Sequence, residues 1–309
     1  MYALMTTTET PGYLLVAEVA DPEPLPHEAL VRVSAASINR GELRLISMRP
    51  DGWRPGQDVA GVVEAPAADG SGPPAGTRVV AWPDQAGWAE LVAVPTDLVV
   101  ALPEQVDAAR AATLPVAGVT ALRAVRRGGQ ILGRRCLVTG ATGGVGRFAV
   151  EIAHQSGALV TAIALGPASA TDLRDLGARE VFASPSEAPG RYALILESVG
   201  GASLEAMPQR LDSDGVLVLF GVSSGEPARL SFADFRESPN CRVELLRVYG
   251  TGEPRSRGED LAQLVDLVAQ GRLHPKIGHE VDFRQVNQVL RSLKDRKLPG
   301  KAVLRFDGP

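Results

Sequence analysis

The sequence contains few of the residues that build disulfide frameworks and metal centres. Its 309 residues include two cysteines, Cys136 and Cys241, and four histidines. Two thiols are too few for a disulfide framework or a four-thiolate zinc site, so we expect a reducing compartment, with the cytoplasm as the default. The histidines are scattered along the chain, which is typical of surface and capping roles rather than metal ligation: His27, His154, His274 and His279.

Long apolar segments and an excess of one charge are also missing. No stretch approaches the length of about 18 apolar residues that a membrane helix needs, and the N-terminal segment lacks the basic region and apolar core of a secretory signal. The 32 basic and 36 acidic residues give a net charge of -4 and form no long block of one sign. We therefore expect neither membrane nor nucleic acid as a partner, and small neutral or anionic molecules remain.

The rest of the composition is that of an ordinary globular protein. Hydrophobic residues make up 45% and charged residues 22%. At roughly 150 residues per domain, the length predicts about two domains. Glycine (33 residues) and proline (23) are frequent, which favours many turns between short elements.

The first hundred residues are predicted to form strands. Short valine-rich segments separated by Pro, Gly and Asp predict a partly open, mostly antiparallel β-barrel or sandwich. These segments span residues 29–37, 58–65, 77–82, 88–94 and 97–102. From about Asp107, alanine and leucine recur at helical spacing, interrupted by Pro115 and Gly118. This change of period indicates a joint between two domains.

After the joint, apolar strands alternate with amphipathic helices. Near-continuous apolar strands in such an alternation are typical of a parallel sheet covered on both faces, a doubly wound α/β domain. The predicted strands cover 136–140, 158–165, 180–184, 192–198 and 216–221, and the predicted helices cover 144–155, a segment ending near 177, and about 204–211. The last part of the chain breaks the alternation, and we expect it to pack near the first domain, with helices over 259–270 and 284–297 and a strand over 301–306.

The most informative segment is the glycine-rich turn in LVTGATGGVGRFAVEIAHQSG, residues 137–157. It follows a predicted strand and opens a predicted helix, which is the context that a dinucleotide-binding fingerprint requires. In the pattern Ala141-x-Gly143-x-x-Gly146, Gly143 lets a pyrophosphate approach the backbone and Gly146 lets the helix pack on the strand. The first amides of the helix and its dipole would face the anion. The turn thus predicts cofactor contacts at Thr142, Gly143, Gly144, Val145 and Gly146.

The residues after the second strand bear on the choice between NAD(H) and NADP(H). In NAD-binding domains, a carboxylate about twenty residues past the turn bonds the adenine ribose. Here the strand ends in Ala164-Leu165-Gly166-Pro167, and the first acidic residue is Asp172, already in the next helix. NADP(H) is therefore favoured, with NAD(H) as the alternative. Ser169 and Arg174 are the nearby residues that could receive the 2′-phosphate.

Two other enzyme classes share parts of these motifs and are disfavoured. Thr139-Gly140-x-x-x-Gly144-x-Gly146 matches short-chain dehydrogenases, but no tyrosine has a lysine four residues away to form their proton-transfer pair. Residues 221–225, GVSSG, match the G-x-S-x-G nucleophile elbow of hydrolases. That elbow needs a helix directly after the serine, whereas Pro227 and no helical start follow here.

Several segments of the sequence resemble the zinc-independent medium-chain dehydrogenases, the quinone oxidoreductase group. They are SINRGELR (37–44), GQDVAGVVEA (56–65), AGWAELVAV (86–94), AATLPVAGVTA (111–121), GATGGVGRFAV (140–150), ESVGG (197–201), VLVLFGVSSG (216–225) and PGKAVLRF (299–306). The resemblance implies a GroES-like, mostly antiparallel β-barrel catalytic domain of residues 1–116 and 250–309. It also implies a Rossmann domain of residues 117–249, and a homodimer for which the apolar segment 242–249 is a candidate edge strand.

The resemblance further implies which residues outside the turn contact the cofactor. Those near the nicotinamide would be Thr120 and the backbone of Phe220, Gly221 and Val222. Those bordering the adenosine side would be Val199 and Gly200. Lys301 would approach the pyrophosphate from the returning catalytic domain.

The segment that would stand beside the reacting ring departs from the family pattern. Asn39 matches the asparagine of the family's SxNxxD segment, but Arg40-Gly41-Glu42 follows where the family more often has a small residue, an aspartate and an apolar neighbour. Glu42 either replaces the aspartate one position away or is a surface charge. Arg40 and Arg44 could offer a cation to a substrate oxygen, so the candidate catalytic residues are Asn39 and Arg40.

The positions that hold zinc in metal-dependent relatives carry other residues in this chain. Where those proteins have a cysteine, a histidine-glutamate pair and a second cysteine, this chain has Asn39, Gln57 with Asp58, and Val116. Without these ligands a tetrahedral zinc site is not expected. The four-cysteine structural lobe of those relatives is missing as well.

The predicted function is therefore the metal-free reduction of a conjugated acceptor. NADPH would pass hydride to a quinone, or to an alkene conjugated to a carbonyl, and such substrates need little help from a Lewis acid. The sequence offers no convincing proton donor for this reaction. The alternative from a different class is thus a non-catalytic NADP(H)-binding sensor or structural protein.

Overall fold

The chain folds into two compact units. The computed structural model describes residues 1–9, 12–164, 168–250 and 253–306. Unit 1 comprises Met1–Val119 and Pro254–Pro309, and unit 2 comprises Thr120–Glu253. The boundary expected after residue 116 lies three residues before the observed one, which follows Val119. The boundary expected after residue 249 lies four residues before the observed one, which follows Glu253.

Unit 1 is built on a mostly antiparallel sheet. Its main path has the order β14-β15-β3-β4-β5-β7, and β6 pairs with β3. Pairing of β15 with β3 places Ala302 opposite Ile38, so a strand from the end of the chain lies beside a strand from its beginning. The bounds are β1 (Tyr2–Thr6), β2 (Leu14–Glu18), β3 (Glu28–Ile38), β4 (Asp58–Ala65), β5 (Arg78–Ala81), β6 (Leu91–Pro95), β7 (Val99–Ala101), β14 (Ile277–Asp282) and β15 (Lys301–Arg305). This sheet confirms the mostly antiparallel first domain.

The sequence patterns identify some elements of unit 1 and miss others. They identify α7 (Arg257–Ala269) and α8 (Val286–Lys294), but they miss α1 (Arg40–Met48), β14 and the β1–β2 pair. Gly41 lowers the helix propensity of α1. The helix begins with one half of a capping box, because Glu42 Oε2 accepts the backbone N–H of Asn39 at 2.8 Å.

The helical segment at the joint is divided into three pieces. They are α2 (Ala108–Ala111), a π-helical turn at Leu114–Gly118, and α3 (Val119–Arg126). Pro115 falls in the π-helical turn, where its missing N–H interrupts the regular hydrogen-bond ladder. The predicted interruption near Pro115 and Gly118 is thus present as a change of helix type.

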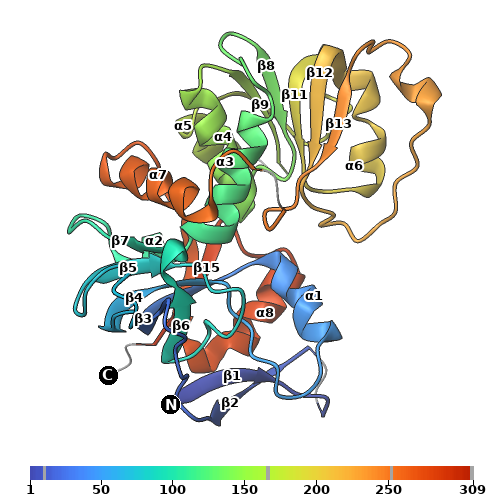
Figure 1. The fold of residues 1–309 in the computed structure, drawn as a ribbon. Coiled ribbons are helices and arrows are strands. Elements are labelled where there is room, and N and C mark those ends of the chain that lie inside the picture. Colours follow the sequence, from blue (N-terminus) through green and yellow to red (C-terminus); the bar gives the residue numbers. More distant parts are fainter. Residues whose placement is uncertain (10–11, 165–167, 251–252, 307–309) are drawn as a thin grey trace. The chain divides into compact units, whose positions relative to one another are not determined.

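Unit 2 is a doubly wound parallel sheet with the strand order β10-β9-β8-β11-β12-β13. Its strands are β8 (Arg135–Val138), β9 (Leu159–Ile163), β10 (Ala178–Phe182), β11 (Tyr192–Glu197), β12 (Leu211–Leu219) and β13 (Arg242–Leu245). The order reverses between β8 and β11, the place where dinucleotides bind in this architecture. Figure 1 shows α4 (Gly144–Gln155) and α5 (Ala168–Asp175) on one side of the sheet and α6 (Gly201–Glu205) on the other. The predicted Rossmann domain is confirmed.

One predicted helix of unit 2 has the wrong bounds. The sequence pattern indicates a helix near residues 204–211, whereas α6 ends at Glu205 and Leu211 already begins β12. Pro208 lies between them in a 3₁₀ turn, and proline disfavours the helical conformation at the residue before it.

Among the described residues, no helix is both long and apolar enough to cross a membrane.

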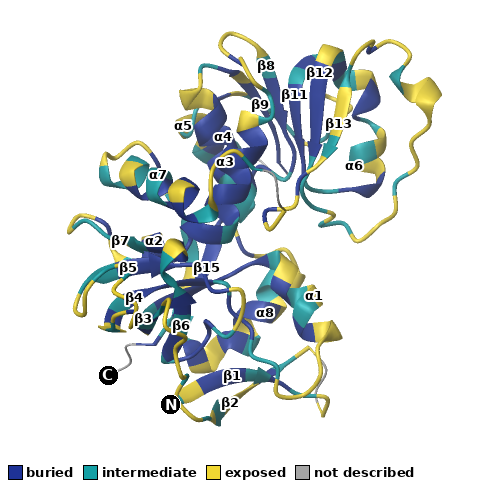
Figure 2. Ribbon diagram, viewed as in Figure 1, coloured by how far each residue is buried: buried dark blue, intermediate teal, exposed yellow. Residues whose placement is uncertain are grey.

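The core of unit 2 lies against its central strands. Leu137 on β8, Ile195 on β11 and Leu217 on β12 are fully buried, and Figure 2 shows these strands in the colour of buried residues. The last strand of the sheet differs, because Val243 and Leu245 on β13 are 45% and 80% exposed. Among the described strands, β13 is therefore an uncovered sheet edge.

Candidate functional site

The glycine-rich turn connects β8 to α4 in unit 2. Gly140 has a φ of 57°, a left-handed conformation that favours glycine. The N–H of Gly143 donates to Gly140 O at 3.0 Å, and Gly143 is the N-cap residue of α4. The N–H groups of the first helical turn, at residues 144–146, have no acceptor within the helix and point toward its N-terminal end.

The two glycines of the fingerprint have different surroundings. A Cβ on Gly146 would lie 2.2 Å from Gly140 O and 2.7 Å from Ala141 Cα, so glycine alone allows α4 to pack this closely on the turn. Among the described residues, a Cβ on Gly143 would come within 4 Å of one atom, Gly140 O at 3.3 Å. Residues 142–145 are all partly exposed. The turn thus presents accessible backbone donors at a helix N-terminus, which fits a diphosphate group.

The ends of β11 and β12 lie beside this turn. The backbone N–H of Ser198 donates to Thr139 Oγ1 at 3.0 Å. The N–H groups of Ser223 and Ser224 donate to the carbonyls of Ser198 and Val199 at 3.0 and 2.8 Å. The structure thus brings one group of sequence-predicted residues to the same edge of the sheet as the turn: Val199, Gly200, Phe220, Gly221 and Val222. Their contact with a nucleotide stays a prediction.

A buried glutamate to which the sequence analysis assigned no role shapes this edge. Glu197 ends β11 and is fully buried. Its Oε1 accepts the N–H groups of Val199 and Gly200, both at 2.7 Å, and its Oε2 accepts Ser203 Oγ at 3.1 Å. These bonds hold a turn in which Gly200 has a φ of 78°. An acidic residue that ends an apolar strand and precedes two glycines is the signal that could have identified it.

The region after β9 is the other predicted part of a nucleotide site. β9 is followed by Ala164, which provides no carboxylate, and residues 165–167 lie outside the described residues. The side chain of Ser169 in α5 also lies outside them, so its predicted contact with a 2′-phosphate stays a prediction. Arg174 is exposed. Asp172 pairs with Arg147 of α4 at 3.6 Å, a partner that the sequence analysis missed.

A buried polar cluster lies in unit 1 where β3 ends and where β4 and β15 begin. Asp58 is fully buried, and its Oδ2 accepts hydrogen bonds from Ser37 Oγ at 2.7 Å and Asn39 Nδ2 at 2.8 Å. The same oxygen accepts Lys301 Nζ at 3.2 Å, and Lys301 also donates to Asn39 Oδ1. Lys301 is 4% exposed. Asp58 and Lys301 therefore form a buried, hydrogen-bonded ion pair, and the predicted contact of Lys301 with a pyrophosphate stays a prediction.

Glu42 adds a second buried carboxyl group to this cluster. It is fully buried, and its Oε1 has no hydrogen-bond partner among the described residues. Desolvation, reinforced by the charge of Asp58, raises the pKa of Glu42 to about 8. The N–H of Asn39, the charge of Lys301 and the N–H of Gln57 oppose this rise to a smaller extent. Glu42 is therefore mainly protonated at neutral pH.

The position of Glu42 corrects two expectations from the sequence. The interpretation of Glu42 as a surface charge is wrong, because the residue is fully buried. The one-position offset from the family aspartate is also wrong, because Glu42 follows Asn39 by three residues, as the aspartate does in SxNxxD. Its bond to the Asn39 N–H shows why an acidic residue suits this place at the start of α1.

The other candidate catalytic residue points to a different partner. Arg40 Nη2 donates to the carbonyl of Leu293 on α8 at 2.8 Å. Burial, together with the charge of Arg296, lowers the pKa of Arg40. Arg44 is exposed and lies against Met48. The structure thus places the Asn39 side chain in the Asp58 cluster and the Arg40 guanidinium on α8. In unit 2, Thr120 is buried in α3 and its predicted role is not tested by this geometry.

Of the residues that the resemblance places at zinc positions, Asn39 and Val116 contact Asp58. The N–H of Val116 donates to Asp58 Oδ1 at 2.9 Å, and Asn39 Nδ2 donates to Oδ2. The Gln57 side chain instead donates to a backbone carbonyl at 3.3 Å. Within the described ranges, no group of three or more His, Cys, Asp or Glu is arranged to hold a metal ion.

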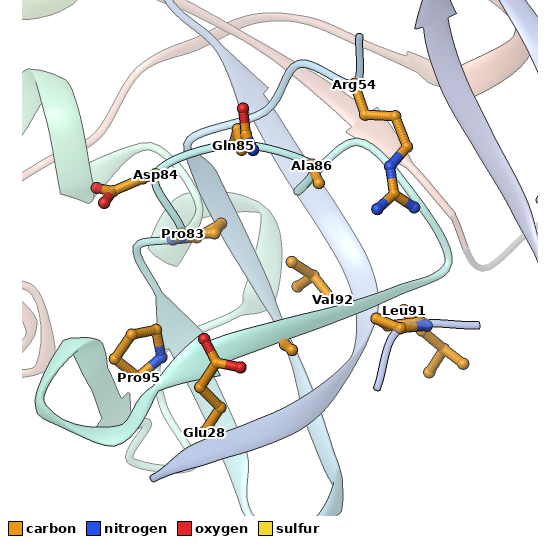
Figure 3. A pocket seen from close by; sticks show the side chains of 11 residues that line it. Glu28, Arg54, Pro83, Asp84, Gln85, Ala86, Leu91, Val92 and Pro95 are labelled. Carbon is orange, nitrogen blue, oxygen red and sulfur yellow. The ribbon is translucent and has the colours of Figure 1, made fainter. Parts of the chain in front are cut away.

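A surface pocket of about 270 Å³ lies elsewhere in unit 1. Figure 3 shows the side chains of Glu28, Arg54 and Asp84 among those that line it. None of the residues that the sequence analysis assigned to a cofactor or to catalysis lines this pocket. It therefore contributes nothing to the site built from those residues.

Comparisons with known proteins place the chain among dehydrogenase families. The alcohol dehydrogenase GroES-like domain family matches residues 25–104, and the zinc-binding dehydrogenase family matches residues 169–304. A chloroplastic quinone-oxidoreductase homolog from Spinacia oleracea is 31% identical over 70% of this chain and 72% of its own length. A chloroplast envelope quinone oxidoreductase homolog from Arabidopsis thaliana is 27% identical over 98% of both chains. The fold matches Escherichia coli quinone oxidoreductase complexed with NADPH, with a TM-score of 0.87, 21% identity, and coverage of 99% of this chain and 100% of that one.

Proposed function

Because the chain belongs to the quinone oxidoreductase-like medium-chain dehydrogenases, we propose that it is an NADPH-dependent, metal-free reductase of quinones or of alkenes conjugated to a carbonyl. The observation that carries this proposal is the accessible turn between β8 and α4, where residues 142–145 are partly exposed at the N-terminus of the helix. Two relatives are described as quinone oxidoreductase homologues, and one protein of the same fold is described as complexed with NADPH. These descriptions support the choice of acceptor and cofactor.

The residues of unit 2 would bind and orient the cofactor. NADPH, when bound, supplies the hydride for such a reduction. The N–H groups at residues 144–146, which have no acceptor within α4, and the dipole of that helix would hold its diphosphate. The backbone of residues 220–222, at the same edge of the sheet, would orient the nicotinamide ring. Position 164, directly after β9, is an alanine and not the carboxylate that would bond the ribose hydroxyls of NAD(H).

The buried ammonium of Lys301 supports the metal-free part of the proposal. It is bonded to Asn39 and Asp58, at the positions where metal-dependent relatives have zinc ligands. A divalent ion at this place would have to displace a paired cation, and an amide and a carboxylate are poor substitutes for thiolate and imidazole ligands. A conjugated acceptor spreads the charge left by hydride addition onto its own oxygen, so it needs little Lewis-acid assistance. The Asn39 amide is the group we propose to stand nearest that oxygen.

Turnover with a panel of acceptors tests the proposal. Purified protein is mixed with NADPH and with quinones and enones, and the loss of NADPH absorbance is followed. We expect consumption with at least one acceptor. NADPH that binds but is not consumed with any acceptor would favour a non-catalytic sensor instead.

A variant of the turn tests the site itself. Gly143→Val should abolish NADPH binding, because the side chain would fill the space in front of the backbone donors. The φ of -74° and ψ of 171° at Gly143 suit valine, so the fold should be retained. Binding is measured by titrating NADPH fluorescence, and retention of the fold by circular dichroism. Unchanged binding in a folded variant would show that the cofactor site lies elsewhere.

We also propose that two copies of the chain pair through β13. This strand is the last in the sheet order of unit 2 and has no neighbour on its outer side among the described strands. Its exposed Val243 and Leu245 would be covered in a continuous sheet formed by two copies. The molar mass in solution tests this proposal.

A further inference from the structure

Arg147 is a largely buried cation next to the glycine-rich turn. It directly follows Gly146 in the first turn of α4, and its side chain is 12% exposed. Its Nη1 lies 3.6 Å from Oδ2 of Asp172 on α5. The pair therefore connects the first turn of α4 with α5, the two helices on one side of the sheet (Figure 1).

The guanidinium of Arg147 has unused hydrogen-bonding capacity. Its Nε is buried and has no hydrogen-bond partner within the described residues. Burial lowers the pKa of Arg147, whereas the charges of Asp172 and Glu151 act in the opposite direction. A distance of 3.6 Å is longer than a charge-assisted hydrogen bond, which is typically about 2.7–2.9 Å. Asp172 thus favours the charged guanidinium but does not satisfy all of its donors.

The location of this pair corresponds to the ribose end of a dinucleotide site. In doubly wound domains the adenine ribose lies past the carboxyl end of the second strand, between the glycine-rich turn and the next helix. Here that strand is β9, and it is followed by Ala164 rather than by a carboxylate. Asp172 comes three residues after Ser169, which is one helical turn farther along α5. Because α5 begins at Ala168, a guanidinium at Asp172 lies about 6 Å along the helix from its start.

We propose that Arg147 is the residue that selects NADP(H) over NAD(H), by pairing with the 2′-phosphate of the cofactor. Asp172 holds the guanidinium when no phosphate is present. A phosphate monoester carries a charge of about -1.5 to -2 and three acceptor oxygens, so it can satisfy the donors that a single carboxylate leaves unused. This inference rests on the proposed NADPH-dependent function and identifies the residue that sets its cofactor preference.

Binding of the two nucleotides to matched variants tests the inference. Dissociation constants for NADPH and NADH are measured by fluorescence titration of the full chain, and folding is checked by circular dichroism. Arg147→Gln should weaken NADPH binding by about 10- to 100-fold, the range expected for a lost hydrogen-bonded contact to a charged group, and should change NADH binding by less than about 2-fold. Arg147→Lys keeps a positive charge and should lose less affinity for NADPH than Arg147→Gln. Arg174→Gln is the comparison variant, because Arg174 is the exposed arginine of α5 that the sequence analysis named as a candidate for the 2′-phosphate.

Removal of the carboxylate separates recognition from a purely structural ion pair. Asp172→Asn should tighten NADPH binding, because it removes both a competitor for Arg147 and a negative charge near the phosphate. If the ion pair were purely structural, Arg147→Gln and Asp172→Asn would both weaken the binding of NADPH and NADH to a similar extent. The inference is overturned if Arg147→Gln weakens NADPH and NADH alike, or if Asp172→Asn weakens NADPH binding. It is also overturned if Arg174→Gln causes the selective loss. Failure of the unmodified protein to bind either nucleotide would overturn the proposed function as well.

Discussion

Replacement of Glu42 by glutamine should change how the stability of unit 1 depends on pH. Glu42 is fully buried beside Asp58, and its pKa is raised from 4.5 to about 8. Because the folded chain binds this proton more tightly than the unfolded chain, the resulting stabilisation is complete below about pH 4.5 and is lost as the pH rises through about 8. The difference between the two pKa values corresponds to at most about 5 kcal/mol. Glu42→Gln removes the ionisable group and with it this part of the pH dependence.

Tryptophan fluorescence gives a direct assay, because Trp53, Trp82 and Trp88 all lie in unit 1. Urea unfolding is followed at several pH values between about 5 and 9, a window that brackets the raised pKa. Glu259→Gln is a matched control, because Glu259 has the same place in the capping box of α7 but is exposed and its pKa is lowered. We expect a clearly shallower loss of stability with rising pH for Glu42→Gln than for the control. Equal slopes for the two variants would refute the assignment of a protonated, buried Glu42.

Two further predictions concern the ion pair and the sheet edge. Lys301→Met should destabilise unit 1 by about 3–5 kcal/mol in the same urea assay, because it leaves the buried Asp58 carboxylate without its cation. Adding Asp58→Asn to this variant should recover part of the lost stability. A loss of stability below about 1 kcal/mol for Lys301→Met would contradict the importance of the pair. Leu245→Glu should convert the dimer to a monomer, as measured by light scattering. Leu132 is equally exposed in unit 2 but lies away from β13, so Leu132→Glu should leave the protein dimeric. If the Leu245→Glu variant is still a dimer, this edge is not the interface.

The sequence allowed most of unit 2 to be predicted because its signals are local. The strand before Gly140 and the helix after Gly143 follow from apolar periodicity, and the different roles of Gly143 and Gly146 follow from the spacing of the fingerprint. The structure bears out that difference, because a Cβ on Gly146 would lie 2.2 Å from Gly140 O, whereas a Cβ on Gly143 would lie 3.3 Å from the same atom. The error at α6 also has a local cause, the proline at 208.

The contacts that were missed join residues far apart in the sequence. Lys301 and Asp58 are separated by 243 positions, and no periodic pattern indicates that β15 places one beside the other. The same holds for Arg147 and Asp172, which meet because α4 and α5 lie side by side. Glu42 was misplaced because its charge suggests the surface, whereas its bond to Asn39 and its burial are set by the tertiary structure of unit 1.

The most direct test of the central claim is turnover measured together with metal content. Protein treated with a chelator and shown by elemental analysis to hold far less than one metal atom per chain is mixed with NADPH and a conjugated acceptor. The account predicts that NADPH is consumed at the same rate before and after this treatment. Activity that disappears with the metal and returns only when zinc is added would contradict it.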